Sequence, residues 1–191
     1  MKRDYNNLDL YLDRLLPDIY PQPPDAGHLR WANQVFKHWV VSLRHVSSVL
    51  DAGCGDTAFM KSKFEGMGWE YTGIALQTNN PVIVNLDFTF TECADKEFDL
   101  VWARHSLEHS PMPIITLMEW ERISSRYLIL VVPRPTTDLS YVGRNHYSVT
   151  NKEQLKFWLG LSGWKILQDD DTEITEMRFL CGKKSTLGWQ V

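Results

Sequence analysis

An apolar strand that runs directly into a glycine turn constrains this chain more than any other feature. The apolar stretch that includes Val49 ends at Gly53 and Gly55, and Asp56 or Thr57 can cap a following helix through about residue 64. The two glycines allow the chain to reverse tightly and allow a ligand to approach the backbone. We therefore predict a strand, a ligand-binding turn and a helix whose free N–H groups point at the ligand.

The rest of the chain alternates between strands and helices. Further strands are predicted at 70–76, 81–88, 98–104 and 126–133, and helices at 26–43, from Ser110 and from Thr150. This alternation indicates a parallel sheet with helices on both faces. Segments 164–168 and 177–182 have no helix between them, so they are predicted to form an antiparallel hairpin at one edge. The expected fold is α/β and doubly wound, with ligand sites at the carboxyl ends of the strands.

Composition excludes several classes of protein. A length of 191 residues fits one domain, and a net charge of −4 gives no basic footprint for nucleic acid. Three scattered cysteines suggest neither a disulfide framework nor a zinc cluster, which favours a reducing, cytoplasmic setting. No apolar run approaches the roughly 18 residues of a membrane span, and the first residues do not have the pattern of a signal peptide.

Two classes of ligand bind at turns of this kind, and charge separates them. Gly53, Gly55 and Ala58 match the dinucleotide pattern G-x-G-x-x-G/A, which is weak by itself. Asp51 before the first glycine and Asp56 after the second place two carboxylates where they would repel a pyrophosphate. S-adenosylmethionine (SAM) carries an ammonium and a sulfonium group, so the charges favour SAM over NAD. A tight turn without any ligand is the remaining alternative.

The segment VLDAGCGDTAF resembles the first motif of the class I SAM-dependent methyltransferases. Further segments fit the same superfamily in order, namely NLDFTF, EFDLVWARHSLEHSPMP, EWERISSRYLILVVP and NHYSVTNKEQLKFWLGLSGWKI. The resemblance covers about residues 46–181 and is greatest to the small "type 11" group. It implies a Rossmann-like sheet of seven strands, mostly parallel with a C-terminal antiparallel hairpin, and a SAM-dependent methyl transfer activity.

The resemblance also implies which residues hold the cofactor. Asp51 and the two glycines would contact the methionine end of SAM, and the Asp87–Phe88 pair would contact adenine. The complete expected set is Asp51, Gly53, Cys54, Gly55, Gln77, Asp87, Phe88 and Arg104.

The sequence departs from the family pattern at two points. Thr57 replaces the third glycine of the turn. The family usually has an acid at the end of the second strand, which binds both ribose hydroxyls, but the stretch from Thr72 to Leu76 contains none. Gln77 is the expected substitute, at lower affinity because charge-assisted hydrogen bonds are stronger. The missing acid also counts against NAD, and it leaves open a catalytically weak or inactive SAM-binding module.

The segment from His105 to His109, HSLEH, matches the H-x-x-E-H pattern of some zinc proteases. Prolines that start a new helix follow at once, so a stable helix carrying both histidines has no room, and no metal is predicted. The loop after the fourth strand should instead lie beside the transferred methyl group. His105 is the first candidate for a general base and His109 the second, with Glu108 orienting either one. The alternative is that Glu108 or His109 caps the following helix or pairs locally.

A second polar cluster, centred on His146, follows a long loop from Arg134 to Arg144. Loops of this length inside a domain are usually functional or disordered. We predict that the loop forms part of the acceptor pocket and that His146 reaches toward the methyl group. The alternative is a histidine that binds backbone before the cap at Thr150.

The eight tryptophans divide into two groups. Core positions are predicted for Trp39, Trp120, Trp158 and Trp164. Trp102, near the end of the fourth strand, could stack on adenine or wall the acceptor site, and Tyr20, His28 or Trp31 could close the pocket. Residues 1–45 are expected to form an arm and a capping helix, and residues 46–191 the SAM-binding core of a single domain.

The favoured hypothesis is a SAM-dependent methyltransferase that acts on an unidentified small or medium-sized acceptor at oxygen, nitrogen or carbon, without a metal. An inactive SAM-binding module and, behind it, an NAD-linked oxidoreductase remain as alternatives. Neither the methyl acceptor nor the oligomeric state can be identified from the residues.

Overall fold

The computed structural model describes residues 29–76, 78–135, 146–171 and 176–184. Its strands are β1 (Ser48–Ala52), β2 (Glu70–Ala75), β3 (Ile83–Asn85), β4 (Phe98–Arg104), β5 (Ser124–Pro133), β6 (Trp164–Asp171) and β7 (Glu176–Lys183). Its helices are α3 (Leu29–His38), α4 (Lys61–Glu65), α5 (Pro113–Ile123) and α6 (Lys152–Leu161), with short 3₁₀ turns η2 (Val40–Ser42) and η3 (Leu107–His109).

The seven strands form one sheet in the order β3-β2-β1-β4-β5-β7-β6. Strands β1 to β5 pair in parallel, whereas β7 pairs antiparallel with both β5 and β6. The predicted α/β fold with its C-terminal antiparallel hairpin is therefore confirmed. The chain moves outward from β1 in both directions, so the switch point of the topology lies between β1 and β4. In sheets of this kind, ligands bind at that point, beyond the carboxyl ends of the strands.

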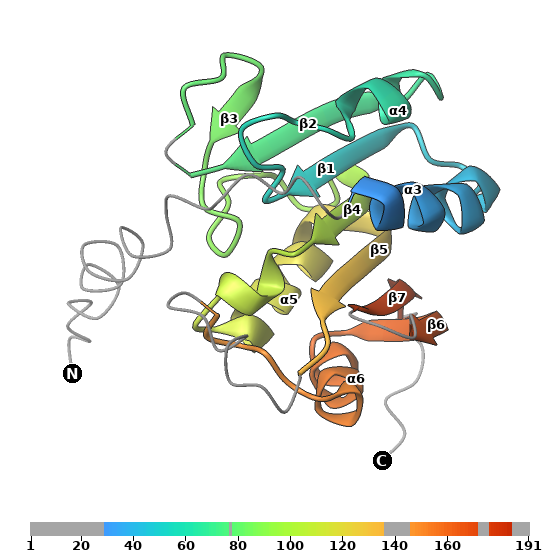
Figure 1. The fold of residues 1–191 in the computed structure, drawn as a ribbon, viewed down its shortest axis with the longest axis vertical. Coiled ribbons are helices and arrows are strands. Elements are labelled where there is room, and N and C mark those ends of the chain that lie inside the picture. The colour runs from blue at the N-terminus through green and yellow to red at the C-terminus, as the bar shows by residue number, and fades with distance from the viewer. Residues whose placement is uncertain (1–28, 77, 136–145, 172–175, 185–191) are drawn as a thin grey trace.

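Helices cover both faces of the sheet, and each face has its own core (Figure 1). Alternate residues of the same strands point to opposite sides. On β5, Leu128 and Leu130 pack toward α5 and α6, whereas Ile129 and Val131 pack toward α3 and α4. Burial on both faces explains why this strand is apolar almost throughout.

Two of the predicted helices start later than expected. Helix α5 begins at Pro113, because the hydroxyl of Ser110 accepts a hydrogen bond from the Met112 N–H (3.1 Å) and contacts Thr116 Oγ1 (2.7 Å) inside the fold. Helix α6 is capped by Asn151, whose side chain accepts from the Gln154 N–H at 2.9 Å. The capping prediction for Thr150 was therefore wrong by one residue.

The core predictions for tryptophan are confirmed at Trp39, Trp120 and Trp164, which are all buried, while Trp158 is half-buried against the α5/α6 core. Trp102 is 1% exposed and packs edge-on against Phe64 in the core beneath α3 and α4. Its predicted role as a pocket wall was wrong, because the side chain at this position of β4 points into the core between the sheet and helices α3 and α4.

The N-terminal capping helix is part of the same core. Ala32 and Val35 of α3 pack with Val49 of β1 and Leu100 of β4. Of the residues expected to close the pocket, Trp31 lies in α3 with the Arg178 guanidinium 5.6 Å from its ring centre. Tyr20 and His28 lie outside the described residues.

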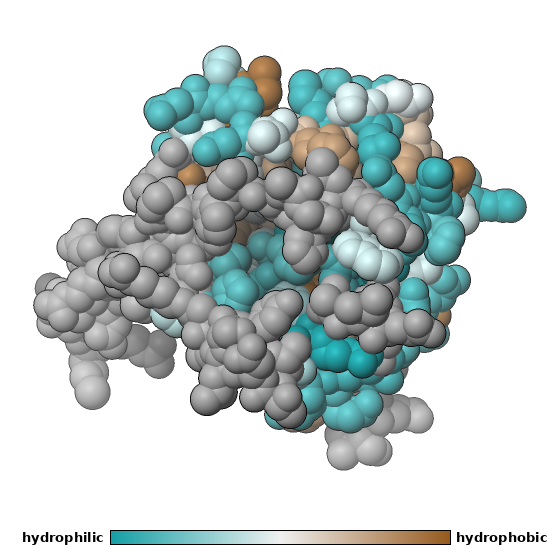
Figure 2. All heavy atoms as spheres, in the orientation of Figure 1, coloured by the Kyte–Doolittle hydropathy of each residue, from teal (hydrophilic) through white to brown (hydrophobic). Residues whose placement is uncertain are grey.

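The surface of the described residues is mostly hydrophilic on the face seen in Figure 2. Among the described residues, no helix has the length and apolar character needed to cross a membrane.

Candidate cofactor and acceptor site

The glycine turn follows β1 directly, as predicted. Gly53 and Gly55 have φ angles of 82° and 63°, and the N–H groups of Gly53 and Cys54 both donate to the Ile74 carbonyl of β2 at 3.0 Å. The turn continues through Ala58, whose φ of 44° is unfavourable for a residue with a side chain. Helix α4 consequently begins only at Lys61, without a side-chain cap. The prediction that Asp56 or Thr57 caps a helix at the turn was wrong, because the helix starts later and its N-cap residue is Met60.

The turn packs closely against the loop that follows β4. A Cβ atom on Gly53 would lie 2.7 Å from the Cβ of Ser106 and 3.8 Å from the Phe88 ring. The Ser106 hydroxyl is buried and has no hydrogen-bond partner among the described residues. The sequence did not single out this serine, because only the sheet brings it beneath the turn.

Substitution of Gly53 by alanine is expected to lower the free energy of unfolding by about 3 kcal/mol, since it adds both backbone strain and a clash with Ser106. Gly55→Ala is the matched control, because it also has positive φ but meets no atom within 4 Å. Urea unfolding of both variants measures the difference. An equal loss in the two variants would show that the contact with Ser106 adds nothing.

Asp51 lies at the carboxyl end of β1 and is 4% exposed. Its Oδ2 accepts a hydrogen bond from the Tyr71 hydroxyl at 2.8 Å. Burial raises the pKa of Asp51 to about 7, against the opposing effects of the Tyr71 hydrogen bond and the charge of Arg104. A cationic ligand favours the ionised form of a carboxyl group, so the binding of a cation would lower the pKa that burial has raised.

Tyr71 reaches Asp51 because the residue between them on that face of the sheet is Gly73. Gly73 pairs with Asp51 across β1 and β2, and a Cβ atom on it would lie 2.9 Å from both the Tyr71 hydroxyl and the Cys54 sulfur. Burial and the Asp51 charge raise the pKa of the Cys54 thiol to about 12, so this thiol stays neutral. The alternation of Tyr71 and Gly73 along β2 was the available signal for this contact.

The predicted adenine-binding pair lies in the segment after β3. Asp87 is buried, and its Oδ1 accepts from the Thr89 N–H at 3.0 Å. Phe88 packs against Trp120, with 6.0 Å between ring centres, and its carbonyl accepts from the Trp120 indole N–H. The Phe88 ring also lies beside the glycine turn, so the segment and the turn border the same region.

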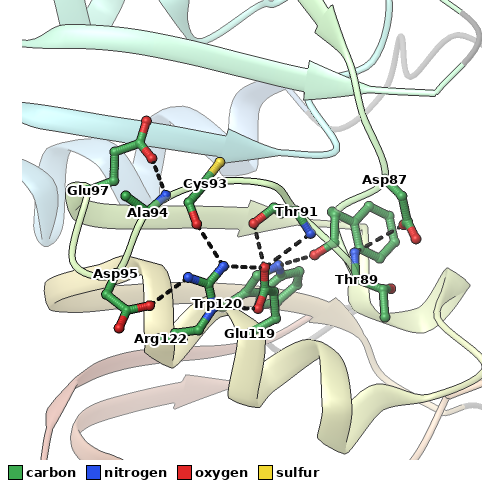
Figure 3. A network of polar contacts seen from close by, with 11 residues as sticks. Asp87, Thr89, Thr91, Cys93, Ala94, Asp95, Glu97, Glu119, Trp120 and Arg122 are labelled. Carbon is green, nitrogen blue, oxygen red and sulfur yellow. Dashed lines mark hydrogen bonds and ion pairs between the residues drawn. The ribbon is translucent and has the colours of Figure 1, made fainter.

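A polar network fixes this segment to α5 (Figure 3). The Glu119 carboxylate accepts from the N–H and hydroxyl of Thr91 and pairs with Arg122. Arg122 also donates to the Cys93 carbonyl (2.8 Å) and to Asp95 (2.7 Å). These contacts hold the loop that carries Asp87 in one position relative to the helix.

His105 begins the loop after β4, with a φ of 51°. Its Nε2 lies 2.9 Å from Glu176 and its Nδ1 3.2 Å from Glu108. Burial opposes protonation, but the two carboxylates outweigh it and raise the pKa of His105 to about 9. Arg104 lies next to this group, with Nη2 3.8 Å from Glu176. An imidazolium between two carboxylates is a hydrogen-bond donor, whereas a general base must be neutral.

The other two candidate histidines come together in space. The rings of His109 and His146 meet edge to face, with 4.8 Å between their centres. The N–H groups of Tyr147 and Ser148 donate to the Glu108 carbonyl at 2.7 and 3.0 Å, which ties this segment to η3. In the sequence, HSLEH and His146 form two separate clusters. The structure brings both of them together around Glu108.

Several predicted site residues fall outside the described part of the chain. These are Gln77 and most of the loop from Arg134 to Arg144, of which residues 136–144 are not described.

Comparison with known proteins finds no matching family model and no matching curated relative. Solved structures do match. A SAM-dependent methyltransferase from Archaeoglobus fulgidus is 16% identical, with a TM-score of 0.64 over 94% of this chain and 100% of that one. Magnesium protoporphyrin IX methyltransferase from Synechocystis PCC 6803, solved with bound SAH (S-adenosylhomocysteine), is also 16% identical, with a TM-score of 0.64 over 95% and 100% of the two chains.

The cyclase SpnF is 15% identical, with a TM-score of 0.68 over 81% of this chain and 80% of that one. At these identities the similarity concerns the fold, which SpnF shares with proteins named as methyltransferases. The strand order, the antiparallel hairpin and the glycine turn after β1 all agree with it. The chain therefore has the fold of the class I SAM-dependent methyltransferases, as the motifs in its sequence indicated.

Proposed function

We propose that this protein binds SAM and transfers its methyl group to a small or medium-sized acceptor. The observation that carries the proposal is Asp51, a buried carboxyl group held by Tyr71 beside a turn with two positive-φ glycines. A cationic ligand satisfies such a group, whereas the phosphates of NAD would be repelled by it. The methyltransferases of Archaeoglobus and Synechocystis that share the fold support the same cofactor.

Residues at the ends of two strands would hold the two ends of the cofactor. Asp51 would accept from the ammonium group, and the turn from Gly53 to Gly55 would border the methionine end together with Cys54. The hydroxyl of Ser106, which has no hydrogen-bond partner in the described part of the chain, lies beneath the same turn and offers a further hydrogen bond. Asp87 and Phe88, fixed to α5 through the network of Glu119, would border the adenine.

The acceptor would lie beyond the carboxyl end of β4, where His105, His109 and His146 surround Glu108. SAM supplies a methyl group activated by a sulfonium leaving group, so the protein's main task is to hold the acceptor atom in line with it. We propose that this cluster orients the acceptor, with Arg104 next to it at the end of β4. A cytoplasmic location is part of the proposal and is consistent with the three free cysteines.

Calorimetric titration of the full chain with SAH, SAM and NAD tests the cofactor. Binding of SAH and SAM without NAD supports the proposal, and binding of NAD alone refutes it. Transfer of labelled methyl from SAM to a fractionated metabolite extract tests the reaction. Specific labelling of a small-molecule fraction is the expected result.

A second candidate is a SAM-binding protein that does not transfer methyl groups. The end of β2, at Ala75 and Leu76, lacks the acid that usually binds the ribose. The cyclase SpnF also has this fold, so the fold does not require methyl transfer. Tight SAH binding without labelling of any fraction would favour this second function.

If Gln77 substitutes for the ribose acid, the variant Gln77→Glu is expected to bind SAH about tenfold more tightly. A carboxylate would accept charge-assisted hydrogen bonds from both ribose hydroxyls, and these are roughly twice as strong as neutral ones. Asn79→Asp, two residues further along, is the matched control for an added negative charge. Equal tightening in both variants would reduce the effect to general electrostatics and remove Gln77 from the site.

A further inference from the structure

Glu108, His109 and His146 bring three potential metal ligands to one place. One ligand atom from each residue lies within 4.8 Å of the others. Glu108 and His109 belong to η3 and are buried, while His146 is half-buried and comes from the segment before α6. The backbone bonds from Tyr147 and Ser148 to Glu108 fix the two segments together, so the cluster does not depend on side-chain placement alone.

The Glu108 side chain gives the second, independent observation. It is 2% exposed, and neither carboxylate oxygen makes a hydrogen bond within the described residues. Its ion-pair partner among the described residues is His105, with Nδ1 3.2 Å from Oε1. A buried carboxylate with unused lone pairs is costly unless a cation or donor completes it.

We propose that Glu108, His109 and His146 form a binding site for a divalent first-row transition metal ion, with Zn²⁺ as its probe. Two imidazoles and one carboxylate are a frequent ligand set for such ions, and three protein ligands leave a coordination position open. Bonds of about 2.0–2.2 Å require ligand atoms about 3.3 Å apart. Ligand atoms that now lie within 4.8 Å of one another would therefore draw together by up to about 1.5 Å when the ion binds.

The position of the site suggests what the open coordination position receives. The cluster follows β4, whose carboxyl end neighbours that of β1 and Asp51. This part of the inference rests on the proposed function: an acceptor hydroxyl bound to the ion would be held beside the methyl group and would lose its proton more easily. The metal site therefore favours oxygen acceptors, such as phenols or enols, over carbon acceptors.

Zn²⁺ titration of the metal-stripped, untagged full chain tests the site. We expect one equivalent to bind, and each of the variants Glu108→Gln, His109→Gln and His146→Gln to weaken binding by at least tenfold. His38→Gln, which removes an exposed histidine from α3, should leave the affinity unchanged. Co²⁺ in place of Zn²⁺ should give a d–d absorption spectrum that the three variants lose.

Thermal unfolding provides a second measurement that does not need a variant. Zn²⁺ at 100 times its dissociation constant should lower the unfolding equilibrium constant of the unmodified protein about 100-fold. The proposal is overturned if Zn²⁺ does not bind, or if the three ligand variants bind it as well as His38→Gln does. SAH titration of the same metal-free samples separates the two proposals, because the cofactor site involves none of these three residues.

Discussion

Replacing Asp51 with asparagine is expected to weaken SAH binding about 100-fold and at the same time to stabilise the ligand-free protein above pH 7. The loss of binding follows from the proposed function, because the variant removes the buried carboxylate that would face the ammonium group of SAH, and such a loss costs about 2–5 kcal/mol. The gain in stability has a separate cause. Asparagine keeps an oxygen that accepts from Tyr71 but cannot ionise in its buried position.

The sign of the stability change follows from the pKa of Asp51, which the fold raises from 3.8 to about 7. Between these two values the unfolded chain releases the proton and the native protein keeps it, so the wild type loses stability as the pH rises from about 4 to 7. The accumulated loss is about 4 kcal/mol above pH 7 and is absent in Asp51→Asn. The charged group that faces Asp51 is Arg104, and the titratable groups Tyr71 and Cys54 beside it are neutral in this pH range.

Urea unfolding of both proteins at pH 5 and pH 8 measures this prediction. The difference in unfolding free energy should grow in favour of Asp51→Asn toward pH 8. The wild type should also bind SAH more tightly as the pH rises through 7, because the ligand then meets a carboxylate. Asp95→Asn is the control, since its carboxylate is 75% exposed. A variant that binds SAH as the wild type does would remove Asp51 from the cofactor site.

Glu176→Gln is expected to lower the free energy of unfolding by about 3 kcal/mol, because removing one member of a buried ion cluster leaves the other charges uncompensated. Glu176 is fully buried, and its carboxylate meets His105 at 2.9 Å, Arg178 at 3.1 Å and Arg104 at 3.8 Å. Glutamine preserves the shape but not the charge. The variant should melt about 10 °C below the wild type.

The pH dependence separates the charge of Glu176 from its packing. Burial opposes ionisation, but His105 and the two arginines hold the pKa of Glu176 below its usual value. The stability it provides is therefore present above about pH 4.5 and is lost as the pH falls further, so the difference from Glu176→Gln should shrink in acid. Glu153→Gln, at a side chain 83% exposed, should change little. A difference that stays constant in acid would assign the effect to packing.

The sheet was the most predictable part of this protein, because its central strands carry a strong local signal. The apolar runs at β4 and β5, the turn glycines and the missing helix between β6 and β7 are all visible in the sequence. Helix starts were predicted less well. The local pattern predicts Ser110 as the cap, but its hydroxyl accepts from the Met112 N–H and contacts Thr116 Oγ1, and α5 begins only at Pro113. Ala58 extends the turn past Thr57 through its positive φ angle, which no local sequence pattern predicts.

In a strand that is buried on both faces, the sequence does not show which side chain points to which face. Trp102 alternates with Val101 and Ala103, and all three are apolar, so the sequence did not show which of them faces a helix and which a ligand. Position near the end of a strand suggested a pocket wall, whereas the register places Trp102 against Phe64.

By itself, the sequence determined the sheet, its hairpin and an acidic glycine turn, because periodicity and turn chemistry are local properties of the chain. Only the tertiary structure decided how that turn is supported and what lies beside it. Tyr71 reaches Asp51 across Gly73, and Glu176 meets His105 from 71 positions away along the chain. His146 joins Glu108 and His109 in the same way. Such contacts depend on which strands and loops become neighbours in the fold, and the spacing of residues along the sequence does not show which ones do.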